Sequence, residues 1–347
     1  MNQKFFKDVI WLGILLVLAT TIHGGQKAEP VTFKSGSFDI SGTLILPHSQ
    51  GAFPLLIFVH GDGRGTKTMY APLVSRFLDT GIACFCSDKP GYGDSRGKFT
   101  RGKILAQRAQ IVADSIQLLK KHKNILAGKI GLWGISQAGW VMPLAMKKNK
   151  DIAFMIVVNG GACDSISQSA FQLRENLMCE GYEKKRALEL EKYYIKMMKA
   201  QKYEVYLENV RPLIKESLVR EMGFVWKEPW PRDRWQANPP DGEAFFNPLG
   251  LVKEMKIPIL AMFGAKDTLC PPLTGSRDYK KVIEKGGNPL SRVVMIAGGD
   301  HSMVLSETGC VKERKKRRGF QWYNYAPGYI DTMLHWLQKI LNPPPGP

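Results

Sequence analysis

The 347-residue sequence lacks the features that mark several specialised classes of protein. It has no internal repeat and no low-complexity linker, which argues against a fibrous protein. Hydrophobic residues make up 44% of the chain, a share ordinary for a soluble globular protein, so a disordered chain is not indicated either. A chain of this length can bury one large core or two modest ones.

Cysteine is scarce as well, and the six cysteines match no metal-binding spacing. A chain this large does not depend on disulfides to fold. Cys84 and Cys86 lie two apart on an expected strand and face the same side, which favours buried thiols over a bridge. The sequence does not fix any pairing, and two pairs are conceivable. They are Cys163 with Cys179 and Cys270 with Cys310.

The chain also lacks an apolar run of the roughly 20 residues that a membrane-spanning helix needs. Lys4 and Lys7 precede a shorter apolar run from Val9 to Ile22, a combination typical of a secretory signal peptide. We therefore expect residues 1–25 to be a signal peptide and the protein to be exported, to the periplasm or the medium. The alternative is an uncleaved N-terminal membrane anchor. No stable membrane span is expected.

The formal net charge of +18 favours contact with anionic surfaces. Lys and Arg are spread along the chain, except in Lys312–Arg318, where six bases surround Glu313. Such a run is typical of a solvated loop, and the alternative is contact with nucleic acid or lipid headgroups. Because no RNA- or DNA-binding signature accompanies the run, we expect no nucleic-acid partner.

The order of the apolar segments predicts the fold class. Alternating residues from 31 to 46 predict an antiparallel hairpin that turns at Ser35-Gly36-Ser37. Short, nearly continuous apolar runs follow, typical of parallel strands covered on both faces. The runs are Pro54–His60, Ile82–Ser87, Lys129–Trp133, Ile152–Asn159, Pro258–Phe263 and Arg292–Ile296. Amphipathic helices are expected at Tyr70–Thr80, Ile104–Lys121, Gly139–Lys148 and Tyr329–Leu341. This alternation predicts an α/β fold, with a mostly parallel central sheet flanked by helices.

Residues 164–245 interrupt the alternation, because they contain no convincing strand but several polar helices. We interpret this segment as an inserted helical cap on a core formed by residues 30–163 and 246–342. The end of the insert is rich in aromatic residues, which either attach the cap to the core or line a substrate pocket. These residues are Trp226, Trp230, Trp235, Phe245 and Phe246.

Ser136 is the candidate nucleophile. A serine hydroxyl needs a base to remove its proton, and it must project beside donors that can stabilise an oxyanion. The segment Gly134-Ile135-Ser136-Gln137-Ala138-Gly139 follows an expected strand and precedes an expected helix, the context of a nucleophile elbow. Residues 134 and 138 are both small, as the sharp turn requires. The alternative is a polar helix cap.

The elbow resembles that of the α/β-hydrolase superfamily, written G-x-S-x-G, with Ala138 in place of the last glycine. The resemblance covers nearly everything after the signal peptide. It is nearest to esterases, dienelactone-hydrolase-like enzymes and relatives of prolyl oligopeptidase. It implies an α/β-hydrolase fold and a triad in the order Ser, Asp, His. Asp267, in Phe-Gly-Ala-Lys-Asp-Thr, matches the acid, and His301, in Gly-Gly-Asp-His-Ser, matches the general base.

The resemblance also implies an oxyanion hole formed by the backbone N–H groups of Asp62 and Gln137. Asp62 lies in His-Gly-Asp-Gly, directly after the first buried strand, where this family places one donor. Because a carboxylate near a developing negative charge is unfavourable, we expect the side chain of Asp62 to point away, toward Arg64. The segment from Asp88 to Gly97 resembles a further superfamily motif that supports the fold, and Ser95 within it is expected to be structural.

The sequence thus predicts a serine hydrolase that cleaves a carboxylic ester through an acyl-enzyme. Ser136 would attack the carbonyl, His301 would move the proton, and Asp267 would orient His301. No metal or organic cofactor is required. The expected substrate is a small-molecule ester or a short peptide.

Two alternatives stay open. A serine peptidase, either an aminopeptidase or prolyl-oligopeptidase-like, could bind a substrate amine through Glu175, Glu180 or Glu183. An inactive hydrolase-fold binding protein could use Lys312–Arg318 as its contact surface.

Overall fold

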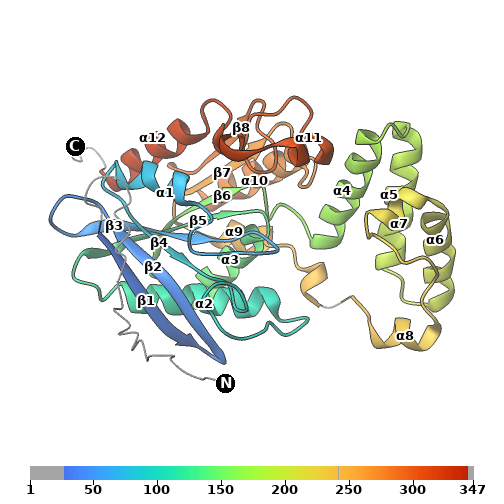
Figure 1. Ribbon diagram of the computed structural model, residues 1–347, viewed down its shortest axis with the longest axis horizontal. Helices are drawn as coiled ribbons and strands as arrows, with labels where there is room; N and C mark the ends of the chain where they lie inside the picture. Colours follow the sequence, from blue (N-terminus) through green and yellow to red (C-terminus); the bar gives the residue numbers. More distant parts are fainter. Residues whose placement is uncertain (1–26, 241, 343–347) are drawn as a thin grey trace, which may run out of the picture.

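The computed structural model describes residues 27–240 and 242–342 (Figure 1). The expected signal peptide at residues 1–25 lies outside the described residues. Among the residues that are described, no helix has the length and apolar character needed to cross a membrane.

The described chain forms one eight-stranded sheet in the order β1-β2-β4-β3-β5-β6-β7-β8. A hairpin of β1 (Lys27–Ser35) and β2 (Phe38–Leu46) joins the sheet antiparallel to β4. The other strands pair in parallel. They are β3 (Phe53–Val59), β4 (Ala83–Ser87), β5 (Ile125–Ile135), β6 (Ile152–Val158), β7 (Ile259–Gly264) and β8 (Arg292–Ile296). This arrangement confirms the predicted fold class.

Helices cover both faces of the sheet (Figure 1). One apolar cluster joins the sheet to α2 (Ile104–Leu119), α3 (Ala138–Lys148), α9 (Leu249–Glu254) and α10 (Pro272–Gly286). A second cluster joins the opposite face to α1 (Ala71–Leu78) and α12 (Tyr329–Leu341). In folds of this kind, the site lies at the carboxyl ends of the parallel strands.

Strand β8 and helix α10 differ from the expectation. Strand β8 was expected to be covered on both faces, but it lies at the edge of the sheet, and its Met295 is 36% exposed. Helix α10 was not expected, because Pro271-Pro272 at its start is typical of a loop. Proline is nevertheless compatible with the first turn of a helix, where its missing N–H would have no partner.

A separate helical layer follows β6 and precedes β7 (Figure 1). Its members are α4 (Ser165–Cys179), α5 (Lys184–Met198), α6 (Tyr203–Lys215), α7 (Ser217–Glu221), α8 (Arg232–Ala237) and the 3-10 helix η1 (Gly242–Phe245). The described residues of this segment, which we call the cap, contain no strand. They bury an apolar cluster of their own, centred on Leu173, Leu190 and Leu213.

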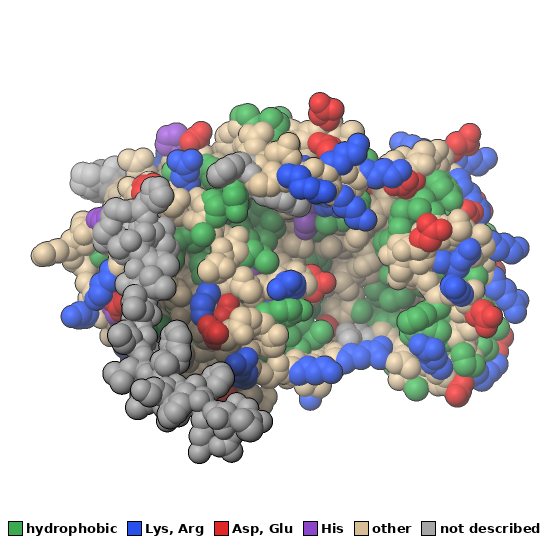
Figure 2. Space-filling view, viewed as in Figure 1, with side chains coloured by type: hydrophobic (Ala, Val, Ile, Leu, Met, Phe, Trp, Pro, Cys, Tyr) green, Lys and Arg blue, Asp and Glu red, His purple; other side chains and the backbone are tan. Residues whose placement is uncertain are grey.

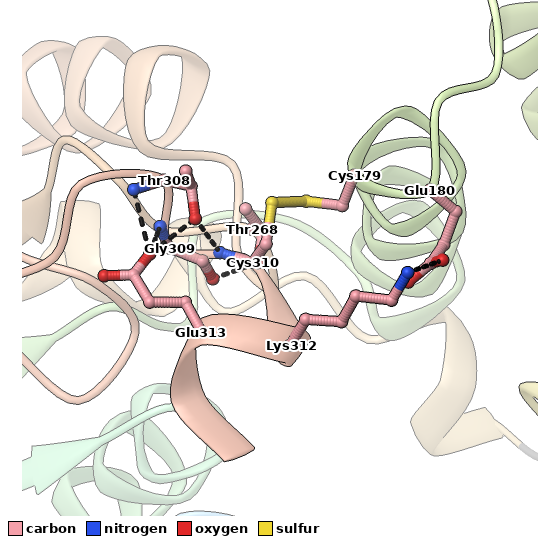
Figure 3. Close-up of a disulfide and its surroundings, with 8 residues drawn as sticks. All are labelled: Cys179, Glu180, Thr268, Thr308, Gly309, Cys310, Lys312 and Glu313. Carbon is pink, nitrogen blue, oxygen red and sulfur yellow. Dashed lines mark hydrogen bonds and ion pairs between the residues drawn. A yellow bond between two sulfur atoms is a disulfide. The ribbon is translucent and has the colours of Figure 1, made fainter. Parts of the chain in front are cut away.

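A disulfide joins the cap to the core (Figure 3). It links Cys179, at the end of α4, to Cys310, which precedes α11 (Val311–Lys316). The two pairings considered from sequence are therefore wrong, since 131 residues separate the bonded cysteines and only the folded cap brings them together. Cys84 and Cys86 are buried free thiols, as expected.

Candidate active site

Ser136 lies on a sharp turn between β5 and α3. Its φ is 58°, a conformation uncommon for any residue other than glycine and frequent at functional sites. A side chain at Gly134 would place its Cβ 2.5 Å from that of Ala138, so the turn requires small residues at both positions. The Ser136 N–H donates to the carbonyl of Val158, 2.9 Å away, which ties the turn to the end of β6.

Asp267 and His301 lie together at neighbouring strand ends. Asp267 follows β7, and its Oδ2 accepts a hydrogen bond from His301 Nδ1 at 2.9 Å. Its Oδ1 accepts the backbone N–H groups of Leu269 and Cys270, at 2.7 and 3.0 Å. These donors fix the buried carboxylate, which in turn fixes the imidazole. Within the described residues, no hydrogen bond joins the Ser136 hydroxyl to His301.

Asn159 connects the three strand ends, and sequence reasoning missed it. Its side chain is fully buried and donates to the carbonyls of Asp300 and His301, at 2.9 and 3.0 Å. Its Oδ1 accepts the N–H of Gly264, at the end of β7, at 2.7 Å. The neighbouring Gly160 packs so closely on Ser136 that an added Cβ would lie 2.0 Å from the Ser136 carbonyl oxygen. A polar residue that ends an otherwise apolar strand was the available signal.

The basic run Lys312–Arg318 is only partly a solvated segment, because its first residues form α11 and Arg317 is buried. Arg317 pairs with the buried carboxylate of Asp300 at 2.6 Å, directly before His301 in the chain. The expectation of a solvated loop is wrong for Arg317, because this side chain is buried and pairs with Asp300 in the loop that carries His301. Lys315, Lys316 and Arg318 remain exposed.

The loop His60–Gly63 lies directly against the nucleophile. An added Cβ on Gly61 would lie 3.2 Å from the Cβ of Ser136. The backbone N–H groups of Asp62 and Gln137 donate to no other group among the described residues, so both are free to bind an oxyanion. The Asp62 side chain is exposed but forms no ion pair with Arg64 in the described part of the chain, contrary to expectation.

Two buried cations lie beneath this loop, and both were missed from sequence. Lys89 follows β4, and its Nζ donates to the carbonyls of Gly61 and Gly63, at 2.5 and 3.0 Å. Arg108 on α2 donates to the carbonyl of His60 and to Oε1 of Gln137. Burial lowers the pKa of Lys89 to about 7 and that of Arg108 to about 10.

The negative charge of Asp62 acts against both of these shifts, by raising the pKa values of Lys89 and Arg108. Its electrostatic partners are therefore these buried cations instead of Arg64. For Arg108, the signal in the sequence was a basic residue on the buried face of an amphipathic helix. Lys89 lay within a segment that we interpreted as purely structural.

Ser95 in the segment from Asp88 to Gly97 is structural, as expected. It is 1% exposed, and its hydroxyl donates to the Asp88 carbonyl and accepts the Ser41 N–H, both at 2.9 Å. The Asp88 carboxylate accepts backbone N–H groups from Lys67 and Asp94. The segment therefore ties β2, β4 and the loop after β3 together.

A pocket of about 530 Å³ lies between the cap and the loop that carries Asp267. The surface is hollowed between core and cap, with Lys and Arg at its rim (Figure 2). Arg174 lines the pocket and pairs with Glu175 and Glu191, at 2.9 Å each. Of the acidic residues considered for amine binding, Glu175 alone lines this pocket. Glu180 pairs with Lys312 (Figure 3).

The aromatic residues at the end of the cap lie in different surroundings. Trp230 and Trp235 pack on the apolar cluster of the cap, and Phe246 packs on the core. Trp226, Trp230 and Trp235 also line a pocket of about 180 Å³.

One group among the described residues has the composition of a metal site, namely Asp267, Cys270 and His301. Asp267 and His301 are bonded to each other, and burial raises the pKa of the Cys270 thiol, which opposes the thiolate that a metal needs. The arrangement suits acid–base chemistry better than metal binding.

A search of curated proteins found one relative over part of the chain. The curated quorum-quenching protein AidA of Acinetobacter baumannii (strain MDR-ZJ06) is 25% identical over 126 residues, which are 36% of this chain. The match spans only 41% of the length of that relative.

Solved structures share the fold over almost the whole chain. Esterase Pf2001 of Pyrococcus furiosus is 14% identical with a TM-score of 0.53, covering 90% of this chain and 93% of its own. Acylaminoacyl peptidase of Pyrococcus horikoshii is 16% identical with a TM-score of 0.53, and the match covers 94% of this chain and 43% of the peptidase chain. At such identities these likenesses establish the fold alone.

A sequence model described as "Alpha/beta hydrolase family" matches residues 56–311, a range that contains Ser136, Asp267 and His301. This range is more than half of the chain, and the sheet and helices have the arrangement that the family implies. The chain therefore belongs to the alpha/beta hydrolase family.

Proposed function

We propose that this protein is an exported serine hydrolase that cleaves a carboxylic ester. Ser136 is the nucleophile, His301 the general base and Asp267 the acid that orients it. The observation that carries the proposal is the turn at Ser136, held at a φ of 58° against the ends of the strands that bring Asp267 and His301 within 2.9 Å of each other.

The mechanism follows from these positions. His301 removes the proton of Ser136 as its oxygen attacks the carbonyl carbon, and returns that proton to the leaving group. Asp267 accepts the Nδ1 proton, so that Nε2 of His301 is the basic nitrogen. The oxyanion binds the free N–H groups of Asp62 and Gln137, the second of which lies at the positive N-terminus of α3. Water then hydrolyses the acyl-enzyme.

Charge in the pocket favours an ester over a peptide with a free N-terminus. A peptidase that binds a substrate ammonium group uses unpaired carboxylates for that purpose. Here Glu175 and Glu191 are both bonded to Arg174, which offsets part of their negative charge. The cap therefore offers a neutral acyl group a better environment than a cationic amine.

Export is supported by the disulfide, because such bonds persist in oxidising compartments and are rare in the cytosol. The apolar run from Val9 to Ile22 is the segment that would direct export. Mass spectrometry of the secreted or periplasmic protein should give an N-terminus beyond that run.

A substrate panel tests the proposed reaction. Acyl esters of graded length should be hydrolysed faster than aminoacyl and peptide amides, and His301→Ala should lower turnover by several orders of magnitude without unfolding the protein. Faster cleavage of aminoacyl-arylamides would favour the peptidase. Full activity of the folded His301→Ala protein would exclude the triad.

A further inference from the structure

Lys89 and Arg108 both donate to the carbonyl groups of the oxyanion loop, residues 60–63. Three contacts result, to the carbonyl oxygens of His60, Gly61 and Gly63. Lys89 is 7% exposed and Arg108 is 5% exposed. Burying two cations is costly unless hydrogen bonds to fixed dipoles compensate, so these contacts are specific features of the loop.

The contact at Gly61 determines the direction of one oxyanion donor. The Gly61 carbonyl and the Asp62 N–H belong to the same planar trans peptide, in which they point in opposite directions. Holding the carbonyl oxygen 2.5 Å from Lys89 Nζ therefore holds the Asp62 N–H on the other side. That N–H has no other partner among the described residues that could hold it in place.

Arg108 connects the two segments that supply the donors. One nitrogen of its guanidinium binds the His60 carbonyl, and another binds the side chain of Gln137. Because the guanidinium is rigid and planar, it fixes the loop relative to the elbow. Arg108 therefore contributes to the separation of the Asp62 and Gln137 N–H groups.

We infer that Lys89 and Arg108 are the positioning residues of the oxyanion hole, which orient the Asp62 N–H and hold it at a set distance from that of Gln137. The inference rests on the proposed serine hydrolase function. Neither side chain acts on the substrate directly. Their removal loosens a preorganised site, which weakens binding of the transition state more than binding of the substrate.

The test uses Lys89→Met and Arg108→Met, which keep the aliphatic length and remove the donors. Losing one oxyanion donor typically costs a factor of about 100 or more in kcat, so we expect each variant to lose on the order of 100-fold in kcat with little change in KM. Lys67→Met is the matched control, because Lys67 contacts Asp88 and Asp94 but no carbonyl of the oxyanion loop. It should keep the wild-type kcat.

A second readout separates positioning from general support. An alkylboronic acid forms a tetrahedral adduct with Ser136 and places an oxygen in the oxyanion hole, whereas an unreactive planar substrate analogue does not. In both methionine variants, affinity for the boronic acid should fall in parallel with kcat, while affinity for the planar analogue stays the same. An equal loss for the two ligands, or an unchanged kcat, would overturn the inference.

Two controls keep the result decisive. If the methionine variants do not fold, Gln137→Ala removes the side-chain partner of Arg108 and keeps the backbone N–H, and an unchanged kcat there would overturn the role of Arg108. Lys89→Arg keeps the charge but changes the donor geometry, and it should also lose kcat. If the wild-type protein hydrolyses no ester, the proposed function itself is wrong, and this result is known before any variant is compared.

Discussion

Asn159 links the elements that carry the candidate catalytic residues. It joins the ends of β6 and β7 to the histidine loop, and Arg317 supports the same loop through Asp300. Neither contact can be derived from spacing, because the partners are far apart in the sequence.

Asn159→Asp keeps the acceptor for Gly264 but replaces the donor to the carbonyls of Asp300 and His301 with a carboxylate oxygen. We expect a loss of about 1–3 kcal/mol in the free energy of unfolding, because buried carbonyls lose their donor. We also expect kcat of the folded variant to fall, because the histidine loop is no longer held in place. Asn149→Asp is the control, since Asn149 is also buried and binds the Ala113 carbonyl away from the site. Equal kcat in the two variants would contradict this role.

Glu313 is a second residue whose contribution can be measured. Burial raises its pKa, but hydrogen bonds from the neighbouring loop outweigh burial and lower the pKa to about 2. The donors are the hydroxyl and N–H of Thr308 and the N–H of Gly309 (Figure 3), together with the N–H of Glu307. Because the pKa in the folded protein is below the ordinary 4.5, the stabilisation is present above pH 4.5 and is lost as the pH falls toward 2.

Glu313→Gln should therefore be less stable than the wild type at pH 6, and the difference in Tm should shrink as the pH is lowered through this window. Thermal unfolding of both proteins across the range measures it. A difference that stays constant with pH would show that the charge of Glu313 is not what stabilises the loop.

At the scale of elements, patterns of apolar residues predicted most of the core strands and helices, because burial on a sheet face or a helix face repeats with a fixed period. The exceptions have physical reasons. The edge position of β8 is a property of strand order, and α10 begins with prolines that also suit a loop. The pairing of Cys179 with Cys310 depends on how the cap folds back, which no local pattern records.

The disulfide gives a prediction for the cap as an element. A double Cys179→Ser, Cys310→Ser variant should lose about 2–4 kcal/mol of stability, because the unfolded chain is no longer cross-linked. The bond also reaches the site, since the Gly309 carbonyl accepts the hydroxyl of Thr268, next to Asp267 (Figure 3). Lower kcat is therefore expected together with the lower Tm.

A reductant provides the control for this variant. It should lower the Tm of the wild type toward that of the double variant and leave the double variant unchanged. Equal Tm values for the oxidised wild type and the double variant would mean that the disulfide contributes nothing to the attachment of the cap.

At the scale of the whole molecule, the sheet brings the candidate residues together at the carboxyl ends of its parallel strands. Ser136, Asp267 and His301 follow β5, β7 and β8, so that parallel pairing of these strands with β6 brings residues distant in the sequence together. Motifs at strand ends could be read from the sequence for this reason. The cations under the oxyanion loop could not, because Lys89 and Arg108 meet there from separate elements.

The central claim is that Ser136 is an activated nucleophile, and covalent labelling by a fluorophosphonate tests it most directly. Intact mass and peptide mapping of the folded wild-type protein should show one label, on Ser136, and the label should be absent in Ser136→Ala and form far more slowly in His301→Ala. A folded wild-type protein that takes no label, or a label that persists in Ser136→Ala, would contradict the account.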